Sequence, residues 1–185
     1  MGNFTTLGAD LRALRKSRGL TLDDMAKRLN MSVGWLSQVE RDISTPDTGT
    51  LQKIATVLDV PMSLFFGSNA GPDNEHGRIV RAASRRELGE REGGLLETLL
   101  SPDLTDSFEM VHSTFMPGSK RHEPSARPTQ EVAYLISGQL DIWLDDVFFA
   151  IQAGDSFRIR GQSLRWANPY QNPAVAVWVI SPPVY

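Results

Sequence analysis

Apolar residues recur every three or four positions through the first third of the chain, which is the period of helices that face a shared core. They form four groups, namely Leu7, Leu11 and Leu14; Leu22, Met25, Ala26 and Leu29; Leu36 and Val39; and Leu51, Ile54, Ala55 and Leu58. This pattern predicts a bundle of short helices between residues 7 and 66.

Residues that commonly begin or end helices separate these groups, namely Gly19, Thr21, Asn30, Ser32, Asp47 and Pro61. Thr21 is followed three residues later by Asp24, an arrangement typical of a capping box. Asn30 suits the left-handed position that ends a helix, and Ser32 suits the start of the next one. Asp47 and Pro61 predict the starts of a fourth helix and a short fifth helix.

In the second half of the chain the apolar period changes to two, which is the period of β-strands. The runs "LDIWL" (140–144), "DSFRI" (155–159) and "AVAVWVI" (174–180) alternate in this way between turn residues. The stretch "FFGSNAGPDNEHG" (65–77) is rich in Gly, Asn, Pro and Asp and reads as a linker. We therefore predict a helical domain over residues 1–67, a linker over 68–78, and an all-β sandwich or barrel over 79–185.

Composition excludes several classes of protein. The 185 residues, 41% hydrophobic and 22% charged, are ordinary for a soluble globular chain. No cysteine is present, which excludes disulfides, thiolate zinc sites and a cysteine nucleophile. No run approaches the roughly 18 apolar residues of a membrane helix, and no signal peptide begins the chain, so we expect a cytoplasmic protein with no membrane partner.

The net charge of −3 argues against a protein that binds polyanions over its whole surface. The charge is unevenly divided, because residues 1–67 hold eight Lys and Arg against seven Asp and Glu, whereas residues 68–185 hold eleven against fifteen. Any contact with nucleic acid is therefore expected from the first domain, through the placement of individual side chains.

The stretch "TLDDMAKRLNMSVGWLSQVERD" (21–42) places two helices and a tight turn within about twenty residues. Met25 and Ala26 of the first helix would face Leu36 and Val39 of the second. The outward positions of the second helix are then free, namely Ser32, Val33, Gly34, Trp35, Gln38 and Arg41. A helix of this size fits the DNA major groove, with its positive N-terminal end toward phosphate.

Residues 7–66 resemble the helix-turn-helix domain of the XRE family of bacterial regulators, which is similar to phage repressors of the lambda type, and "SVGWLSQVE" (32–40) resembles its recognition helix. The resemblance implies a five-helix domain that binds double-stranded DNA, and an ion pair between Arg15 and Glu40. It implies base contacts from Val33, Gly34 and Gln38, and backbone contacts from Ser32, Trp35, Arg41, Thr45, Thr50 and Lys53. Leu22 departs from the family, where many members carry a polar residue.

The stretch "PGSKRHEPSARPTQEVAYLISGQL" (117–140) resembles the first motif of the cupin family, and the whole chain resembles XRE regulators with a C-terminal cupin sensor domain. The resemblance implies a double-stranded β-helix, or jelly-roll barrel. His122 and Glu131 match two of the family's metal ligands, whereas Pro124 and Leu164 stand where two histidines are expected. Because such sites commonly need three histidines and a glutamate, we expect no metal, no cofactor and no enzyme activity.

Alternation along the strands predicts an effector cavity in place of the metal site. Leu164 and Trp166 share one face, opposite Arg165, while Phe157 and Ile159 oppose Arg158 and Arg160. The expected effector-binding residues are His122, Glu131, Phe157, Ile159, Leu164 and Trp166. Plain core packing is the alternative for the apolar residues, and contact with water at the barrel mouth is the alternative for Glu131.

Two arginines near His122 in the sequence have two possible roles. Arg121 and Arg127 are expected in a solvated loop, and the alternative is that they clamp an anion.

Together these patterns predict a sequence-specific DNA-binding regulator that acts as a homodimer and whose cupin domain binds a small organic effector. One alternative is a cupin metalloenzyme fused to a DNA-binding domain, and another is a DNA-binding protein whose barrel only dimerises.

Overall fold

The computed structural model describes residues 6–66, 73–75, 77–88, 93–102 and 104–184, in two compact units. The first unit holds the described residues up to Arg86 together with residues 102–106. The second holds residues 87–101 and 107–184. Most of the predicted linker, residues 68–72 and 76, lies outside the described residues.

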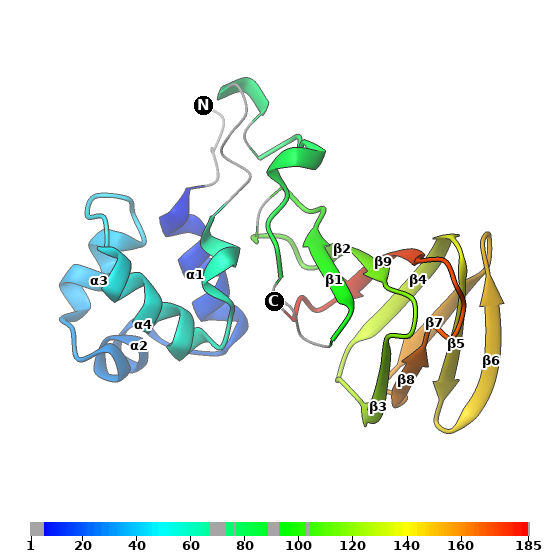
Figure 1. The fold of residues 1–185 in the computed structure, drawn as a ribbon. Coiled ribbons are helices and arrows are strands. Elements are labelled where there is room, and N and C mark those ends of the chain that lie inside the picture. The colour runs from blue at the N-terminus through cyan, green and yellow to red at the C-terminus, as the bar shows by residue number, and fades with distance from the viewer. Residues whose placement is uncertain (1–5, 67–72, 76, 89–92, 103, 185) are drawn as a thin grey trace. The chain divides into compact units, whose positions relative to one another are not determined.

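The first unit is a bundle of short helices (Figure 1). Its helices are α1 (Leu7–Ser17), α2 (Leu22–Leu29), α3 (Val33–Val39), α4 (Thr48–Leu58) and the 3₁₀ helices η1 (Met62–Phe65), η2 (Asp73–Glu75) and η3 (Ala82–Ser84). The four predicted α-helices are confirmed, and the expected fifth helix is the single 3₁₀ turn η1, with Pro61 at its N-cap.

The helices begin and end at the residues that the sequence predicts. Thr21 and Asp24 form the capping box of α2, because each side chain accepts a hydrogen bond from the backbone N–H of the other. Ser32 and Asp47 cap α3 and α4 by accepting from the N–H three residues later. Asn30 ends α2 with a φ of 55°, in the left-handed region. These local bonds satisfy N–H groups that a helix start leaves without partners.

A buried ion pair joins α1 to the end of α3. The Nε of Arg15 lies 2.5 Å from Oε1 of Glu40, and the Nη2 of Arg15 donates to Oε2 at 2.9 Å. Arg15 also donates to the backbone oxygen of Leu20. The two side chains are 9% and 5% exposed, so the pair implied by the family resemblance is present and buried.

A second buried ion pair lies on α1, and no sequence pattern predicted it. The Nη2 of Arg86 lies 2.7 Å from Oδ2 of Asp10, with both side chains at most 5% exposed. The other oxygen of Asp10 accepts a hydrogen bond from the backbone N–H of Leu104 at 3.3 Å. Asp10 therefore binds two segments that are far from it in the chain.

The second unit consists of two antiparallel sheets (Figure 1). Its strands are β1 (Leu95–Leu99), β2 (Glu109–Phe115), β3 (Lys120–Ser125), β4 (Gln130–Ser137), β5 (Gln139–Leu144), β6 (Val147–Gln152), β7 (Ser156–Arg160), β8 (Leu164–Ala167) and β9 (Ala174–Ser181). One sheet has the order β1-β2-β9-β4-β7 and the other has the order β3-β8-β5-β6. The predicted all-β fold is confirmed, and the runs quoted above form β5, β7 and β9.

Alternation along the strands sets which side chains face the interior between the sheets. On β4, Glu131, Ala133 and Leu135 are buried, whereas Val132 and Tyr134 between them are exposed. The register pairs Glu131 with Ile159 of β7 and Ile180 of β9. Glu131 is thereby held among inward-facing apolar residues.

Aromatic contacts fill the rest of this interior. Trp166 of β8 packs edge-on against Phe115 of β2 with ring centroids 4.8 Å apart. Phe157 of β7 packs edge-on against Trp178 of β9, with ring centroids 5.3 Å apart.

Among the residues that the structure describes, no helix has the length and hydropathy needed to cross a membrane.

Candidate DNA-binding surface and ligand cavity

Helix α3 presents its N-terminal end and one side to solvent. Ser32, Val33, Gly34 and Gln38 are exposed, and Trp35 is half-buried. Leu36 and Val39 are buried, and they anchor the opposite side of the helix in the core of the bundle. The predicted outward residues therefore share one accessible surface, with the helix N-terminus at one end of it.

The amide of Gln38 is held by a neighbouring side chain. Its Oε1 accepts a hydrogen bond from the hydroxyl of Ser44 at 3.0 Å, and its backbone oxygen accepts from the N–H of Ile43 at 2.9 Å. The Ser44 bond uses one lone pair of Oε1 and leaves the other lone pair and the amide N–H groups available. Glutamine with this freedom pairs with the N6 and N7 edge of adenine. Ser44 is a contact that the sequence analysis did not identify.

Most residues expected at the DNA backbone are also accessible. Arg41, Thr45 and Lys53 are exposed, and Arg41 donates from Nε to the backbone oxygen of Ser37 at 3.1 Å. Thr50 of α4 differs from the expectation of a contact with the DNA backbone, because the residue is buried and only 9% exposed. Its backbone N–H is already bound to the cap residue Asp47.

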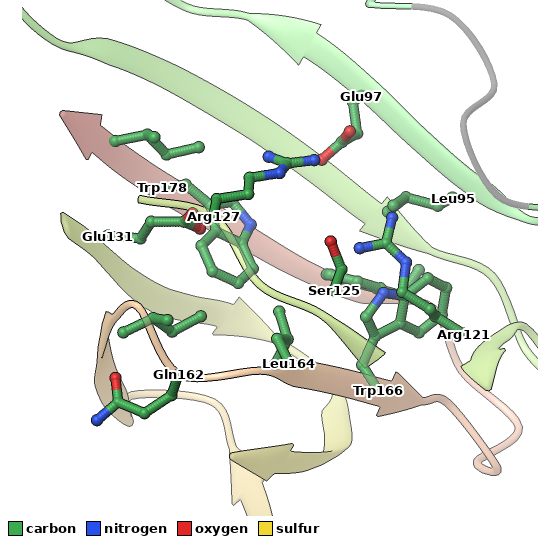
Figure 2. A pocket seen from close by; sticks show the side chains of 13 residues that line it. Leu95, Glu97, Arg121, Ser125, Arg127, Glu131, Gln162, Leu164, Trp166 and Trp178 are labelled. Carbon is green, nitrogen blue, oxygen red and sulfur yellow. The ribbon is translucent and has the colours of Figure 1, made fainter. Parts of the chain in front are cut away.

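The interior of the second unit contains a cavity of about 60 Å³ (Figure 2). Its walls combine apolar and charged side chains from both sheets, namely Leu95, Glu97, Phe115, Arg121, Ser125, Arg127, Glu131, Ile159, Gln162, Leu164, Trp166, Trp178 and Ile180. The volume exceeds the roughly 10–15 Å³ that one water requires, so the cavity has room for a small molecule.

Four of the six predicted effector residues line this cavity, namely Glu131, Ile159, Leu164 and Trp166. His122 does not, because it lies on β3 with its side chain exposed to solvent. Phe157 is half-buried and packs behind Trp178. Glu131 is 7% exposed, and its Oε1 accepts a hydrogen bond from the hydroxyl of Thr129 at 2.6 Å. Thr129 is therefore a partner of Glu131 that the sequence did not indicate.

The positions of Arg121 and Arg127 differ most from the sequence-based expectation. Arg121 and Arg127 line the cavity and are partly buried, although a solvated loop was predicted for both. Glu97 of β1 brings a second carboxylate, whose Oε1 accepts from the hydroxyl of Ser113 at 2.8 Å. Figure 2 shows Arg127 extending between the two carboxylates in that view. The charged part of the cavity is thus larger than the sequence indicated.

His122 and Glu131 do not come together as metal ligands, since one faces solvent and the other faces the cavity. Among the described residues, no three His, Asp or Glu side chains are grouped closely enough to hold a metal ion.

Two family models match the chain. A helix-turn-helix model covers residues 11–65, and a cupin domain model covers residues 111–180. These ranges lie in the helical unit and in the two-sheet unit respectively.

Curated relatives match across both parts. The HTH-type transcriptional regulator SutR of Escherichia coli K12 is 29% identical over 154 residues, which cover 82% of this chain and 80% of SutR. The HTH-type transcriptional regulator PuuR of the same strain is 23% identical over 152 residues, covering 82% and 81%. Both relatives are transcriptional regulators and not enzymes.

A solved RmlC-like cupin from Shewanella frigidimarina matches the fold of the β unit. It covers 57% of this chain and 91% of its own, with a TM-score of 0.50 and 20% identity. The chain therefore combines a helix-turn-helix domain of the HTH_3 (XRE) type with a C-terminal cupin domain, and it is similar over most of its length to the transcriptional regulators SutR and PuuR.

Proposed function

We propose that this protein binds a specific DNA operator as a homodimer, and that a small organic effector in the cupin cavity changes its operator affinity. The observation that carries the proposal is the accessible face of α3, where Ser44 orients the amide of Gln38 in the last turn of the helix. Base contacts come from Val33, Gly34 and Gln38. Backbone contacts come from Ser32, Trp35, Arg41, Thr45 and Lys53. The proposed protein acts in the cytoplasm, where it binds DNA.

The cavity supports the sensing half of the proposal. Glu131 lies among Ile159, Leu164 and Trp166, and its second carboxylate oxygen has no hydrogen-bond partner among the described residues. A buried carboxylate is costly without a partner, so this oxygen favours a ligand with a donor or a cation. An effector changes DNA affinity only if it binds one arrangement of the dimer more tightly than the other.

An apolar patch on the outer face of the larger sheet supports dimerisation. Val132, Tyr134 and Ile136 of β4 and Val179 of β9 are each at least 40% exposed. Contiguous apolar side chains of this kind commonly mark contacts between protein chains. Two-fold pairing would present two α3 helices to operator half-sites about one DNA turn apart.

Footprinting on the DNA upstream of the protein's own gene and its neighbours tests the proposal. We expect protection of a short two-fold symmetric sequence at physiological salt, and a change in that protection when the right metabolite is added. Protection without sequence preference would contradict the proposed function.

Glu131→Gln tests the site within the same assay. The variant should weaken the response to the effector far more than it weakens operator binding without effector, because it removes only the negative charge. Glu123→Gln on the exposed part of β3 is the matched control and should respond like the wild type. Elemental analysis that finds about one transition metal per chain, lost with activity in His122→Ala, would favour the metalloenzyme.

A further inference from the structure

The cavity contains a buried hydrogen-bond donor without a partner. The Nε1 of Trp178 is inaccessible to solvent, and it donates no hydrogen bond to a residue that the structure describes. The residue itself is 7% exposed and lines the cavity. A buried N–H without an acceptor is unfavourable, so this position favours an acceptor atom supplied by a ligand.

Arg127 adds a positive charge to the same wall. It is partly buried, and it makes no salt bridge or hydrogen bond to another residue that the structure describes. Arginine presents a planar set of N–H donors that matches the two oxygens of a carboxylate. Arg127 and the Trp178 N–H together therefore form a place for an anionic group.

The cavity also contains the carboxylates of Glu131 and Glu97. One oxygen of each is bound, by Thr129 and by Ser113 respectively, which leaves the second oxygen of each without a described partner. Glu131 faces the apolar side chains Leu164 and Trp166 across the cavity. The lining holds two arginines and two glutamates, so the cavity presents groups of both charges to a ligand.

We infer that the effector is a small zwitterion of the amino-acid type, with its ammonium group at Glu131, its carboxylate at Arg127 and the Trp178 N–H, and its side chain against Leu164 and Trp166. The inference rests on the proposed role of this cavity as the effector site.

Binding to the purified full-length protein tests the inference through matched probes. The twenty common L-amino acids are compared by thermal shift and calorimetry. Leucine and phenylalanine are each paired with the amine that lacks the carboxylate (isopentylamine, phenethylamine) and the acid that lacks the ammonium (4-methylpentanoate, 3-phenylpropanoate), and any other amino acid that binds is paired in the same way. At least one amino acid should bind, and each of its single-charge counterparts should bind about tenfold or more weakly, because each loses a charge-assisted hydrogen bond.

Single-residue variants test which side chain binds each charged end of the ligand. Arg127→Met should weaken the amino acid and the acid but not the amine, and Glu131→Gln should weaken the amino acid and the amine but not the acid. Trp178→Phe removes the N–H while keeping an aromatic ring against Phe157. Arg158→Met on the exposed face of β7 is the control for Arg127→Met, and circular dichroism melts check that each variant is folded.

The outcomes separate the ligand class from the proposed function. An amine or an acid that binds as tightly as its amino acid would overturn the zwitterion, and so would a screen in which no amino acid binds. If specific operator binding persists in that case, the proposed function as a DNA-binding regulator is retained and only the proposed ligand class is wrong. If no operator is recognised, the proposed function itself fails.

Discussion

At the scale of single residues, the surface of α3 depends on side chains that were predicted and on one that was not. Gln38 was expected to face DNA because its position in the helix is opposite Leu36 and Val39. The hydrogen bond from Ser44 depends on the turn after α3, which brings residue 44 back beside the helix.

Gln38→Ala should weaken operator binding by about 1–3 kcal/mol, the usual value of a bidentate contact to a base, while binding to random DNA changes little. Titrations on operator and random duplexes at several salt concentrations measure both. Lys53→Ala is the comparison, because loss of a phosphate contact should weaken both duplexes and reduce the salt slope by about 1. Equal losses for Gln38→Ala on the two duplexes would show that this residue does not read sequence.

At the scale of elements, the helices of the first unit are joined by buried charges as well as by apolar packing. Arg15 and Glu40 hold α1 against the end of α3, the helix that we propose to read DNA. The hydrogen bond that Arg15 donates to Glu40 is the main cause that raises the pKa of Arg15 above its ordinary value, so Arg15 stays charged throughout the physiological range. The position of α3 therefore depends on this contact.

Arg15→Met should lower the free energy of unfolding by about 3–5 kcal/mol, because it leaves the Glu40 carboxylate buried without its partner. Urea denaturation measures the change. Arg12→Met, on the exposed side of the same helix, should cost about 1 kcal/mol or less. The double variant Arg15→Met with Glu40→Leu should recover part of the loss, and an Arg15→Met protein as stable as wild type would rule out a structural role for the pair.

At the scale of the whole molecule, the proposed activity needs two copies of the chain. The apolar patch on β4 and β9 is the surface on which we expect them to meet. A second group of exposed apolar residues, Val147, Phe148 and Phe149 on β6, provides an internal comparison, since these side chains are at least 45% exposed.

Val132→Lys should convert the dimer into a monomer, because it places a charge at the centre of the proposed contact. Operator affinity should fall by about 10²–10⁴-fold, since two half-sites are no longer bound by one linked molecule. Light scattering and operator titration measure the two effects. Phe148→Lys should leave both unchanged, and dissociation by that variant alone would move the interface to β6.

The sequence by itself determined the two-domain organisation, the four α-helices with their caps, and the inward faces of β7 and β8. These features are local, because a cap joins residues three apart and an apolar period is visible within one segment. They made Ile159, Leu164 and Trp166 predictable as part of one cavity wall and Gln38 predictable as an outward residue, whereas Glu131 was expected in the cavity through the resemblance to the cupin motif.

Only the tertiary structure decided which side of β3 faces inward. The strand "KRHEPS" has no alternating apolar residues, so its pattern does not specify which set of side chains is buried. In the fold, Arg121 lines the cavity and His122 faces solvent. Trp178, Glu97 and Arg127 line one cavity because pairing between strands brings β9, β1 and the segment before β4 together. Such long-range pairing leaves no mark on the sequence near each residue.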